Sequence, residues 1–360
     1  MSESYHSREN PSVTFSPSFA MDRRGKLWYT GIRTNERENA MTELIRKLCR
    51  DHRLTTAEYE RLIRERTAES TRELRCLADQ TRRDIYGTRV LIRGAVELSS
   101  ICKNDCLYCI QRRSNRSCDR YRLRPREIFD CFEEGYALGH RSFLLRGGED
   151  GFYNDELLVP LVEKLKHKFP GCAVTLSLGE RSRESYGRLY NAGADRYLMR
   201  HECADRALYE SLHPGDMSWE NRMHCLNTVK DIGYQSGCGF IVGLPGQTAA
   251  HLAEDLNYIE EYAPHMVDIS PFLPQPGTPF ADAAPGDREL NNYLLSIIRL
   301  ILPNALIMAQ DQGGILAGAN VMTQTLYPVD PSGEHLAALL QSLSDIGFEG
   351  TTERGDWVEV

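Results

Sequence analysis

The sequence has no long apolar run, no apolar core of a secretory signal and no excess of positive charge. Its apolar runs stay short of the roughly eighteen residues that a membrane-spanning helix needs. A formal charge of -8 at pH 7 and a pI of about 5.8 argue against a surface built mainly to bind nucleic acid. We therefore expect a globular protein of the cytoplasm, with no membrane or nucleic-acid partner.

A disulfide framework and a conventional zinc site are missing as well. The eleven cysteines are an odd number and mostly scattered, unlike those of a disulfide-rich protein. None of the ten histidines stands at zinc-ligand spacing from the clustered cysteines. Cys102, Cys106 and Cys109 are the one cluster, and we expect each of the others to be a small buried hydrophobe or a half-exposed thiol.

Composition and hydrophobic periodicity divide the chain into four parts. Residues 1–40 lack periodicity and are rich in Ser, Asn, Arg and Pro, so we expect a disordered leader. Organelle targeting is an alternative for this leader, against which its interspersed acids count. Residues 41–87 predict helices, with Thr55 or Thr56 as a cap and Gly87 as the stop. Residues 88–350 form the main domain and 351–360 a C-terminal tail.

In the main domain, apolar β-rich runs alternate with amphipathic helices, one of which begins after the cap Ser218 and ends at Gly233. Eight strands with intervening helices predict a (β/α)8 barrel, an α/β fold whose chemistry lies at the carboxyl ends of the strands. The expected strands are 90–98, 141–146, 172–178, 195–200, 236–242, 266–270, 305–309 and 319–323.

One interval breaks the pattern. The nine residues "QDQGGILAG", 310–318, are fewer than the ten to twelve or so that a parallel crossover with a helix needs. Either this seventh connection has no helix or one strand is misplaced. Closure of the barrel near it is left open.

The clustered cysteines follow the first expected strand in "CKNDCLYC". Thiolates suit soft metal centres, and three of them leave one iron of a four-iron cluster without a protein ligand. The C-x3-C-x2-C spacing, with Tyr108 before the last cysteine, resembles the signature of radical S-adenosylmethionine (radical SAM) enzymes. The resemblance implies a [4Fe-4S] cluster at which S-adenosylmethionine binds the open iron and is cleaved to a 5'-deoxyadenosyl radical. A zinc site, an electron-transfer site and chance clustering are the alternatives.

A second motif ends the next strand. "RGGED", 146–150, has two glycines that let backbone carbonyls approach a ligand amine, and it resembles the amino-group motif of the superfamily at Gly147, Gly148 and Glu149. The alternative for a glycine pair is an ordinary turn.

Further cofactor contacts are expected at later strand ends. Glu202 can accept hydrogen bonds from ribose or an amine, and Arg200 can bind an anion, although a structural ion pair is the alternative. Arg222 can reach the cofactor carboxylate or merely be solvated. Gly243 and Pro245 of "GLPGQT" can pack against adenine or form an ordinary turn.

Taken together, the motifs are similar to those of one family. "CKNDCLYCIQRRSNR", "GGEDGFY", "VTLSLGE", "GADRYLMRHECAD", "GLPGQT" and "AGANVM" resemble the [FeFe]-hydrogenase maturase family HydE, over residues 41–357. Methylornithine synthase and biotin synthase are its sister families. The resemblance implies a barrel that works on an iron–cysteine complex carrying carbon monoxide and cyanide, during assembly of the two-iron subcluster of the hydrogenase.

Matched to that family, Cys102, Cys106 and Cys109 are cluster ligands and Glu202 and Arg222 contact the cofactor. Thr175, Arg196 and Arg200 match polar residues of the internal cavity and are the expected catalytic set. An anionic substrate would need such cationic and hydrogen-bonding partners in a water-poor cavity. Expected partners are an electron donor such as ferredoxin or flavodoxin and other hydrogenase maturation proteins.

Two features depart from the family. Residues 310–318 replace a longer segment, and no cysteine follows Cys238 to bind a second cluster, so a single cluster is expected. Two alternatives remain for the function: a mutase with an organic substrate, similar to methylornithine synthase, and a non-catalytic iron–sulfur scaffold.

Overall fold

A computed structural model of the protein describes residues 19–21, 27–29, 36–327 and 333–358. Much of the expected leader therefore lies outside the described residues. Within it, β1 (Phe19–Met21) and β2 (Leu27–Tyr29) pair antiparallel, and the first helix already begins at Glu36. Disorder of the leader remains a prediction. In the described part of the chain, no helix is long and apolar enough to cross a membrane.

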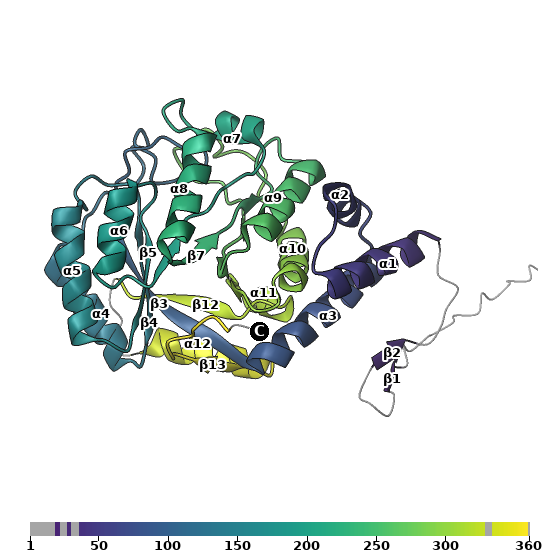
Figure 1. Ribbon diagram of the computed structural model, residues 1–360. Helices are drawn as coiled ribbons and strands as arrows, with labels where there is room; N and C mark the ends of the chain where they lie inside the picture. The colour runs from purple at the N-terminus through teal and green to yellow at the C-terminus, as the bar shows by residue number, and fades with distance from the viewer. Residues whose placement is uncertain (1–18, 22–26, 30–35, 328–332, 359–360) are drawn as a thin grey trace, which may run out of the picture.

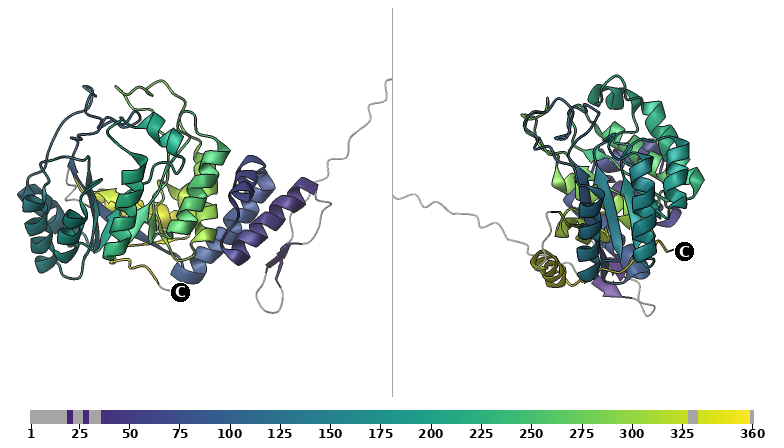
Figure 2. Two further views of the ribbon diagram at one scale, coloured as in Figure 1. Left: turned by 45° about the horizontal axis from the view of Figure 1, so that its top comes forward. Right: turned by 90° about the vertical axis from the view of Figure 1, so that its left-hand side faces the viewer.

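Three helices follow: α1 (Glu36–Asp51), α2 (Thr56–Arg64) and α3 (Ala68–Tyr86). The side chain of Thr55 accepts from the backbone of Glu58 and caps α2, and α3 ends at Gly87 with a φ of 63°, as expected. Figures 1 and 2 show these helices to one side of the main domain, where α2 packs against α9 (Ala249–Tyr262) and α3 against α10 (Arg288–Ile301). Their apolar side chains join the core of the main domain, so they form part of one folding unit.

The main domain is a parallel eight-stranded barrel surrounded by helices (Figure 1). Its strands lie in the order β11-β9-β7-β6-β5-β4-β3-β12. They are β3 (Arg89–Ser99), β4 (Ser142–Gly147), β5 (Ala173–Ser177), β6 (Arg196–Leu198), β7 (Gln235–Cys238), β9 (Met266–Val267), β11 (Leu306–Ile307) and β12 (Val321–Thr325).

Eight barrel strands match the eight expected strands, and the (β/α)8 prediction is confirmed. Two expected strands continue as short second strands, β8 (Ile241–Val242) and β10 (Ser270–Pro271), which pair with each other in parallel. A further strand, β13 (Glu349–Thr351), pairs with the start of β3 and was not expected.

The remaining helices cover the strands. Helix α8 begins after the cap Ser218 and ends at Gly233, which has a φ of 105°, as predicted. These helices are α4 (Pro125–Ala137), α5 (Asp155–Lys168), α6 (Arg183–Asn191), α7 (Arg206–Leu212), α8 (Trp219–Ile232), α11 (Gln312–Leu316) and α12 (Glu334–Asp345).

The seventh connection contains a helix after all, and the bounds of the two strands beside it differ from those expected. Because β11 ends at Ile307 and β12 begins at Val321, residues 308–320 are free for the crossover and accommodate the one-turn helix α11. The barrel nearly closes there through a single bridge between Met308 and Val321. Of the two alternatives left open by the sequence, the one without a helix was wrong. The other was right in part, because the strand expected at 305–309 ends at Ile307 and the one expected at 319–323 begins at Val321.

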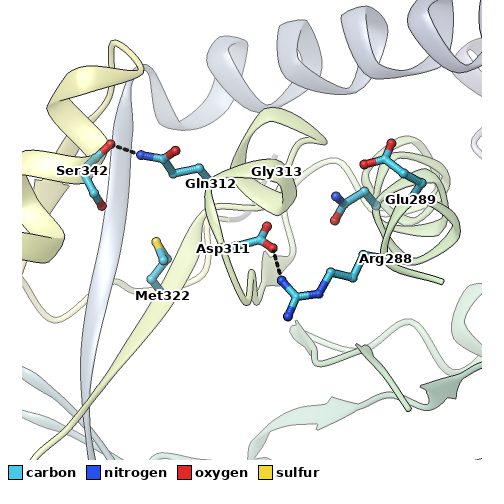
Figure 3. A pocket seen from close by; sticks show the side chains of 8 residues that line it. Arg288, Glu289, Asp311, Gln312, Gly313, Met322 and Ser342 are labelled. Atoms are coloured by element: carbon cyan, nitrogen blue, oxygen red, sulfur yellow. Dashed lines mark hydrogen bonds and ion pairs between the residues drawn. The ribbon is translucent and has the colours of Figure 1, made fainter. Parts of the chain in front are cut away.

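A surface hollow of about 540 Å³ lies beside this short connection (Figure 3). In it, Arg288 Nη1 lies 3.3 Å from Asp311 Oδ2, and Gln312 donates to the backbone carbonyl of Ser342 at 2.6 Å. The hollow is open to the surface, and its polar groups are largely engaged with one another.

Alternation along the strands decides what enters the barrel. On β3, Val90, Ile92 and Val96 pack outward in the main core, whereas Leu91 joins an inner apolar cluster with Leu198 of β6. The inner cluster is completed by Met266, Leu306, Met308 and Val321. Polar residues of the same parity, such as Arg93, therefore also face the interior.

Candidate cluster and cofactor site

The three clustered cysteines lie on the loop that follows β3, at the carboxyl end of the barrel strands. Neighbouring elements fix the backbone of this loop. Lys103 N donates to Glu149 O at 2.9 Å, and Leu107 N donates to Leu212 O at 2.9 Å. The loop is thus held between the end of β4 and the end of α7.

The three thiols are half-buried and close enough to influence one another. Burial raises the pKa of Cys102, Cys106 and Cys109, and the neighbouring thiols contribute further to the rise at Cys106 and Cys109. Cys106 Sγ lies 3.7 Å from Met217 Sδ. Among the described residues, no three His, Cys, Asp or Glu side chains converge as ligands of one metal ion would. A multi-iron cluster needs no common point, because each thiolate binds a different iron.

The glycine pair after β4 packs directly against this loop. Gly147 pairs with Ser99 of β3, and a Cβ at Gly148 would lie 2.4 Å from Ile101 O and 2.7 Å from Cys102 Cβ. A side chain at Gly148 would therefore displace the loop that carries Cys102. The pair permits a close approach of two backbones, which is more than an ordinary turn requires.

A network of charges runs from this loop across the barrel mouth. Glu149 Oε2 lies 3.0 Å from Lys103 Nζ, and Glu149 Oε1 accepts from Glu180 N at 3.1 Å. Glu180 Oε1 in turn pairs with Arg222 Nε at 2.7 Å, and Arg222 Nη1 donates to Arg200 O at 2.7 Å. Arg222 is 6% exposed and is not merely solvated.

Glu202 is held in an unusual backbone conformation at the same mouth. Its φ is 65°, a left-handed value that is rare for a residue other than glycine. Arg200 Nε lies 3.2 Å from Glu202 Oε1, whereas the buried Glu202 Oε2 has no partner among the described residues. Beneath it, Asp255 of α9 accepts from Ala204 N at 2.6 Å and lies 3.2 Å from His201 Nε2. These contacts fix the strained turn and leave one carboxylate oxygen available.

Tyr108 is anchored beside the cluster loop. His213 Nδ1 lies 2.8 Å from the carbonyl of Tyr209, so Nδ1 carries the proton and Nε2 accepts from the Tyr108 hydroxyl at 2.9 Å. Burial lowers the pKa of His213 to about 4, which keeps this acceptor neutral. Tyr108 therefore has a fixed place between two of the cysteines.

A cavity of about 490 Å³ opens beside these groups, a size suited to a small ligand. Tyr108, Cys109 and Arg200 line it together with Ser270, whose hydroxyl accepts from Arg200 Nη1 at 3.0 Å. The structure thus brings the cysteine loop and the end of the fourth expected strand to one cavity.

One expected residue, Thr175, and one that the sequence did not indicate, Arg93, lie deeper in the barrel. Thr175 stands opposite Arg196 in the register of β5 and β6, is fully buried, and its Oγ1 has no partner among the described residues. Arg93 of β3 is 3% exposed and its Nε is also without a partner in the described chain. Burial lowers the pKa of Arg93 to about 10, although Asp268 partly offsets this. The interior therefore offers unused hydrogen-bonding groups.

Arg196 is not brought together with the cysteine loop. Its guanidinium donates to Gly355 O at 2.7 Å and to Gln235 Oε1 at 2.8 Å, and it lies 3.2 Å from Asp356 Oδ1. It stands at the start of β6, roughly 13 Å of extended chain before Arg200. The tail occupies it at the amino end of the barrel, and a catalytic role of Arg196 remains a prediction.

Gly243 and Pro245 form a turn at the mouth. Gly243 has a φ of 86°, its N donates to Gln247 Oε1 at 2.6 Å, and a Cβ there would lie 2.5 Å from Gly286 Cα. The absence of a side chain at Gly243 is thus needed for contact with the backbone of Gly286. Pro245 is half-buried beside this contact. Contact of either residue with a cofactor remains a prediction.

Several residues of the site were missed from the sequence. Glu180 is the last residue of "VTLSLGE", and no role was expected for it. An acidic residue at a strand end, next to a glycine, could have suggested one. Arg93 is the single cation in the run "VLIRGAV". A lone cation in an apolar strand of a barrel could have suggested a polar group in the interior. Asp255 and Met217 carry no local signal, since only the packing of α9 and of the segment before α8 brings them to the site.

Comparisons with known proteins agree with this geometry. The model of the Radical SAM superfamily matches residues 96–259. The [FeFe] hydrogenase maturase subunit HydE of Thermotoga maritima is 42% identical over 248 residues, which are 69% of this chain and 70% of the relative. The 3-methylornithine synthase of Methanosarcina acetivorans is 29% identical over 301 residues, 81% of this chain and 85% of that relative.

Solved structures show the same fold. The crystal structure of methylornithine synthase (PylB) has a TM-score of 0.76 and 25% identity, covering 86% of this chain and 97% of that one. The [FeFe]-hydrogenase maturase HydG has a TM-score of 0.73 at 19% identity, covering 89% of this chain and 77% of that one, a likeness of fold alone. Given the 42% identity across more than two thirds of both chains, this chain belongs to the radical SAM superfamily and, within it, to the family of the [FeFe]-hydrogenase maturase HydE.

Proposed function

We propose that this radical SAM enzyme acts as a HydE-type maturase in assembly of the two-iron subcluster of [FeFe]-hydrogenase. The observation that carries the proposal is the packing of the cysteine loop against Gly148, beside a cavity that also contains Arg200. The 42% identity to the Thermotoga maritima maturase supports the same conclusion. As in the superfamily, the cofactors are a [4Fe-4S] cluster and S-adenosylmethionine.

The residues present fit both cofactors. Cys102, Cys106 and Cys109 would hold the cluster, because burial disfavours their thiolates unless a metal compensates the charge. Glu202 Oε2, buried and without a partner in the described chain, is suited to accept from ribose or an amine of S-adenosylmethionine. When bound, the pair supplies one-electron cleavage of a sulfonium and a carbon-centred radical.

The other residues of the mouth bind and orient. Tyr108 and Gly148 fix the loop that carries the cysteines, and Glu149 ties it to the end of β5. Glu180 holds the guanidinium of Arg222 at 2.7 Å, which sets this cation toward the cofactor carboxylate. The surrounding barrel excludes water from the reacting groups.

The substrate that these groups suit is a compact anion. In the part of the chain that the structure describes, Thr175 Oγ1 and Arg93 Nε are buried in the barrel interior without a hydrogen-bond partner. Arg200 adds a cation on the wall of the cavity at the mouth. An iron complex that carries cyanide, carbon monoxide and a cysteine would be stabilised by such cations in a site of low water content.

The proposal is tested with anaerobically reconstituted protein in two assays. The first measures iron content and the formation of 5'-deoxyadenosine after reduction. The second measures hydrogenase activity in a maturation mixture whose HydE is replaced by this chain. Cleavage of S-adenosylmethionine together with active hydrogenase is the expected result. Cluster binding without cleavage would instead support the scaffold alternative.

A second candidate function has its own support. The fold covers 97% of the solved methylornithine synthase, so a mutase that acts on an amino acid is the alternative. Lysine, the unbranched isomer of 3-methylornithine, is offered to the reduced enzyme. Formation of 3-methylornithine without support of hydrogenase maturation would favour the mutase.

A further inference from the structure

The loop that carries the cysteines is strongly basic in a chain that is acidic overall. Residues 103–126 contain eight Lys or Arg and two Asp, against a formal charge of -8 for the whole chain. Exposed cations among them are Lys103, Arg113, Arg116, Arg120, Arg122, Arg124 and Arg126. We call these seven residues the basic loop surface.

Much of this charge is not neutralised by neighbouring acids. In the described chain, Arg113, Arg116 and Arg124 form no ion pair with a carboxylate. By contrast, Arg112 pairs with Asp105 at 2.9 Å inside the loop, and Arg122 pairs with Asp150 at 2.6 Å. Free guanidinium groups therefore project from the segment that follows the cluster ligands.

The surface is held rigidly. Arg120 donates to the carbonyls of Gln111 at 2.9 Å, Arg112 at 2.6 Å and Asn115 at 3.0 Å, so it braces the loop and keeps its own charge. Asn115 Nδ2 donates to Ile110 O at 2.9 Å and to Pro276 O at 2.8 Å, which joins the loop to the segment after β10. A fixed pattern of cations is what a complementary partner can recognise.

An exposed apolar pair accompanies the cations. Ile110 follows the ligand Cys109 directly and is 38% exposed, and Leu273 is 51% exposed. Both line the cavity that Cys109 also lines. Apolar contacts with a surrounding rim of arginines are typical of protein interfaces.

We propose that the basic loop surface, with Ile110 and Leu273, docks a small acidic one-electron carrier protein that reduces the cluster. The inference rests on the proposed function, which requires an electron from outside the chain. One electron passes from the reduced carrier to the cluster, so the carrier is oxidised by one electron and the cluster is reduced by one. A small carrier fits better than nucleic acid, because a long polyanion would also meet the acidic remainder of the molecule.

Charge reversal at Arg113 and Arg116 tests the proposal. The reconstituted holoenzyme and its R113E/R116E variant are mixed with a reduced acidic flavodoxin, and cluster bleaching is followed by stopped flow. At an ionic strength of about 0.01 M, where charges act over about 30 Å, the rate is expected to fall at least about tenfold in the variant. The salt dependence of the rate is expected to flatten as well.

Matched controls separate this surface from net charge. R46E/R53E makes the same change of charge on α1 and just after it, where Arg46 and Arg53 are exposed, and it is expected to leave the rate within about twofold. Reduction by photoreduced deazariboflavin, a small neutral reductant, is expected to be equal in all three proteins.

The outcomes distinguish the two proposals. Equal flavodoxin rates in R113E/R116E and in the unaltered protein would overturn the docking surface while leaving the enzyme intact. Loss of rate in both charge variants would overturn it too. Binding of RNA or anionic vesicles that R113E/R116E abolishes, with an unchanged flavodoxin rate, would assign the surface to a different partner. No S-adenosylmethionine cleavage even with deazariboflavin would instead overturn the proposed function.

Discussion

Replacement of Gly148 by alanine tests the backbone packing on which the site depends. The added Cβ would lie 2.4 Å from Ile101 O, about 1.0 Å inside the 3.4 Å at which ordinary contact begins. It would also lie 2.7 Å from Cys102 Cβ. Both neighbours belong to the start of the cysteine loop, which the bond from Lys103 N to Glu149 O holds against the end of β4, so the loop must move by several tenths of an ångström. Overpacking of this kind costs about 1–3 kcal/mol of folding free energy.

The larger effect is expected on catalysis. A displacement of about 1 Å in a catalytic array can lower a rate by about a hundredfold. We therefore expect G148A to bind less iron on reconstitution and to form 5'-deoxyadenosine about ten to a hundred times more slowly. Iron content, the spectrum of the reduced cluster and single-turnover formation of 5'-deoxyadenosine are the measurements.

The control is Gly151, where an added Cβ meets nothing within 4 Å. G151A is expected to match the unaltered protein in stability and rate. A G148A protein with normal iron content and a normal cleavage rate would refute the reasoning, because the loop would then have yielded at no cost.

Three further results are expected. Glu202→Gln removes a charge from a carboxylate with an unused buried oxygen, so the KM for S-adenosylmethionine should rise about tenfold with a smaller change in kcat, and an unchanged KM would exclude the contact. Because burial lowers the pKa of His213 from 6.5 to about 4, the unfolded state takes up its proton first as the pH falls. Urea unfolding should therefore show a loss of about 1.5 kcal/mol between pH 6.5 and 5, and His213→Asn should reduce this slope. Deletion from residue 353 onward removes the partners of the buried Arg196 and should lower the unfolding free energy by about 3–5 kcal/mol, which an unchanged urea midpoint would contradict.

Local chemistry predicted much of the fold correctly. The caps at Thr55 and Ser218 and the stops at Gly87 and Gly233 depend on hydrogen bonds and φ values within a few residues, so the sequence carries them. The strands of the barrel follow apolar runs for the same reason. The ends of the strands were less predictable, because a strand stops where its neighbour stops pairing. For this reason the length of the connection at 308–320 was underestimated.

The candidate site divides in a similar way. Three thiols in eight residues and a glycine pair are patterns of adjacent residues, and they indicated the cluster loop and its backbone contact. The sequence could not separate the roles of Arg196 and Arg200. They are four residues apart on one expected strand, so both side chains were expected to point to the same face of the sheet. Only the position of the C-terminal tail showed that Arg196 is satisfied at the amino end, while Arg200 faces the cavity.

By itself the sequence determined the barrel, the spacing of the cysteines and the family, since each rests on residues close together in the chain. Tertiary structure alone decided which charges remain free. Asp255 reaches His201 from α9, and Glu180 holds Arg222 from the far side of the mouth. Glu202 keeps one oxygen without a partner among the described residues. Whether a buried group is used or available depends on partners that are distant in sequence, and these meet only when the barrel closes.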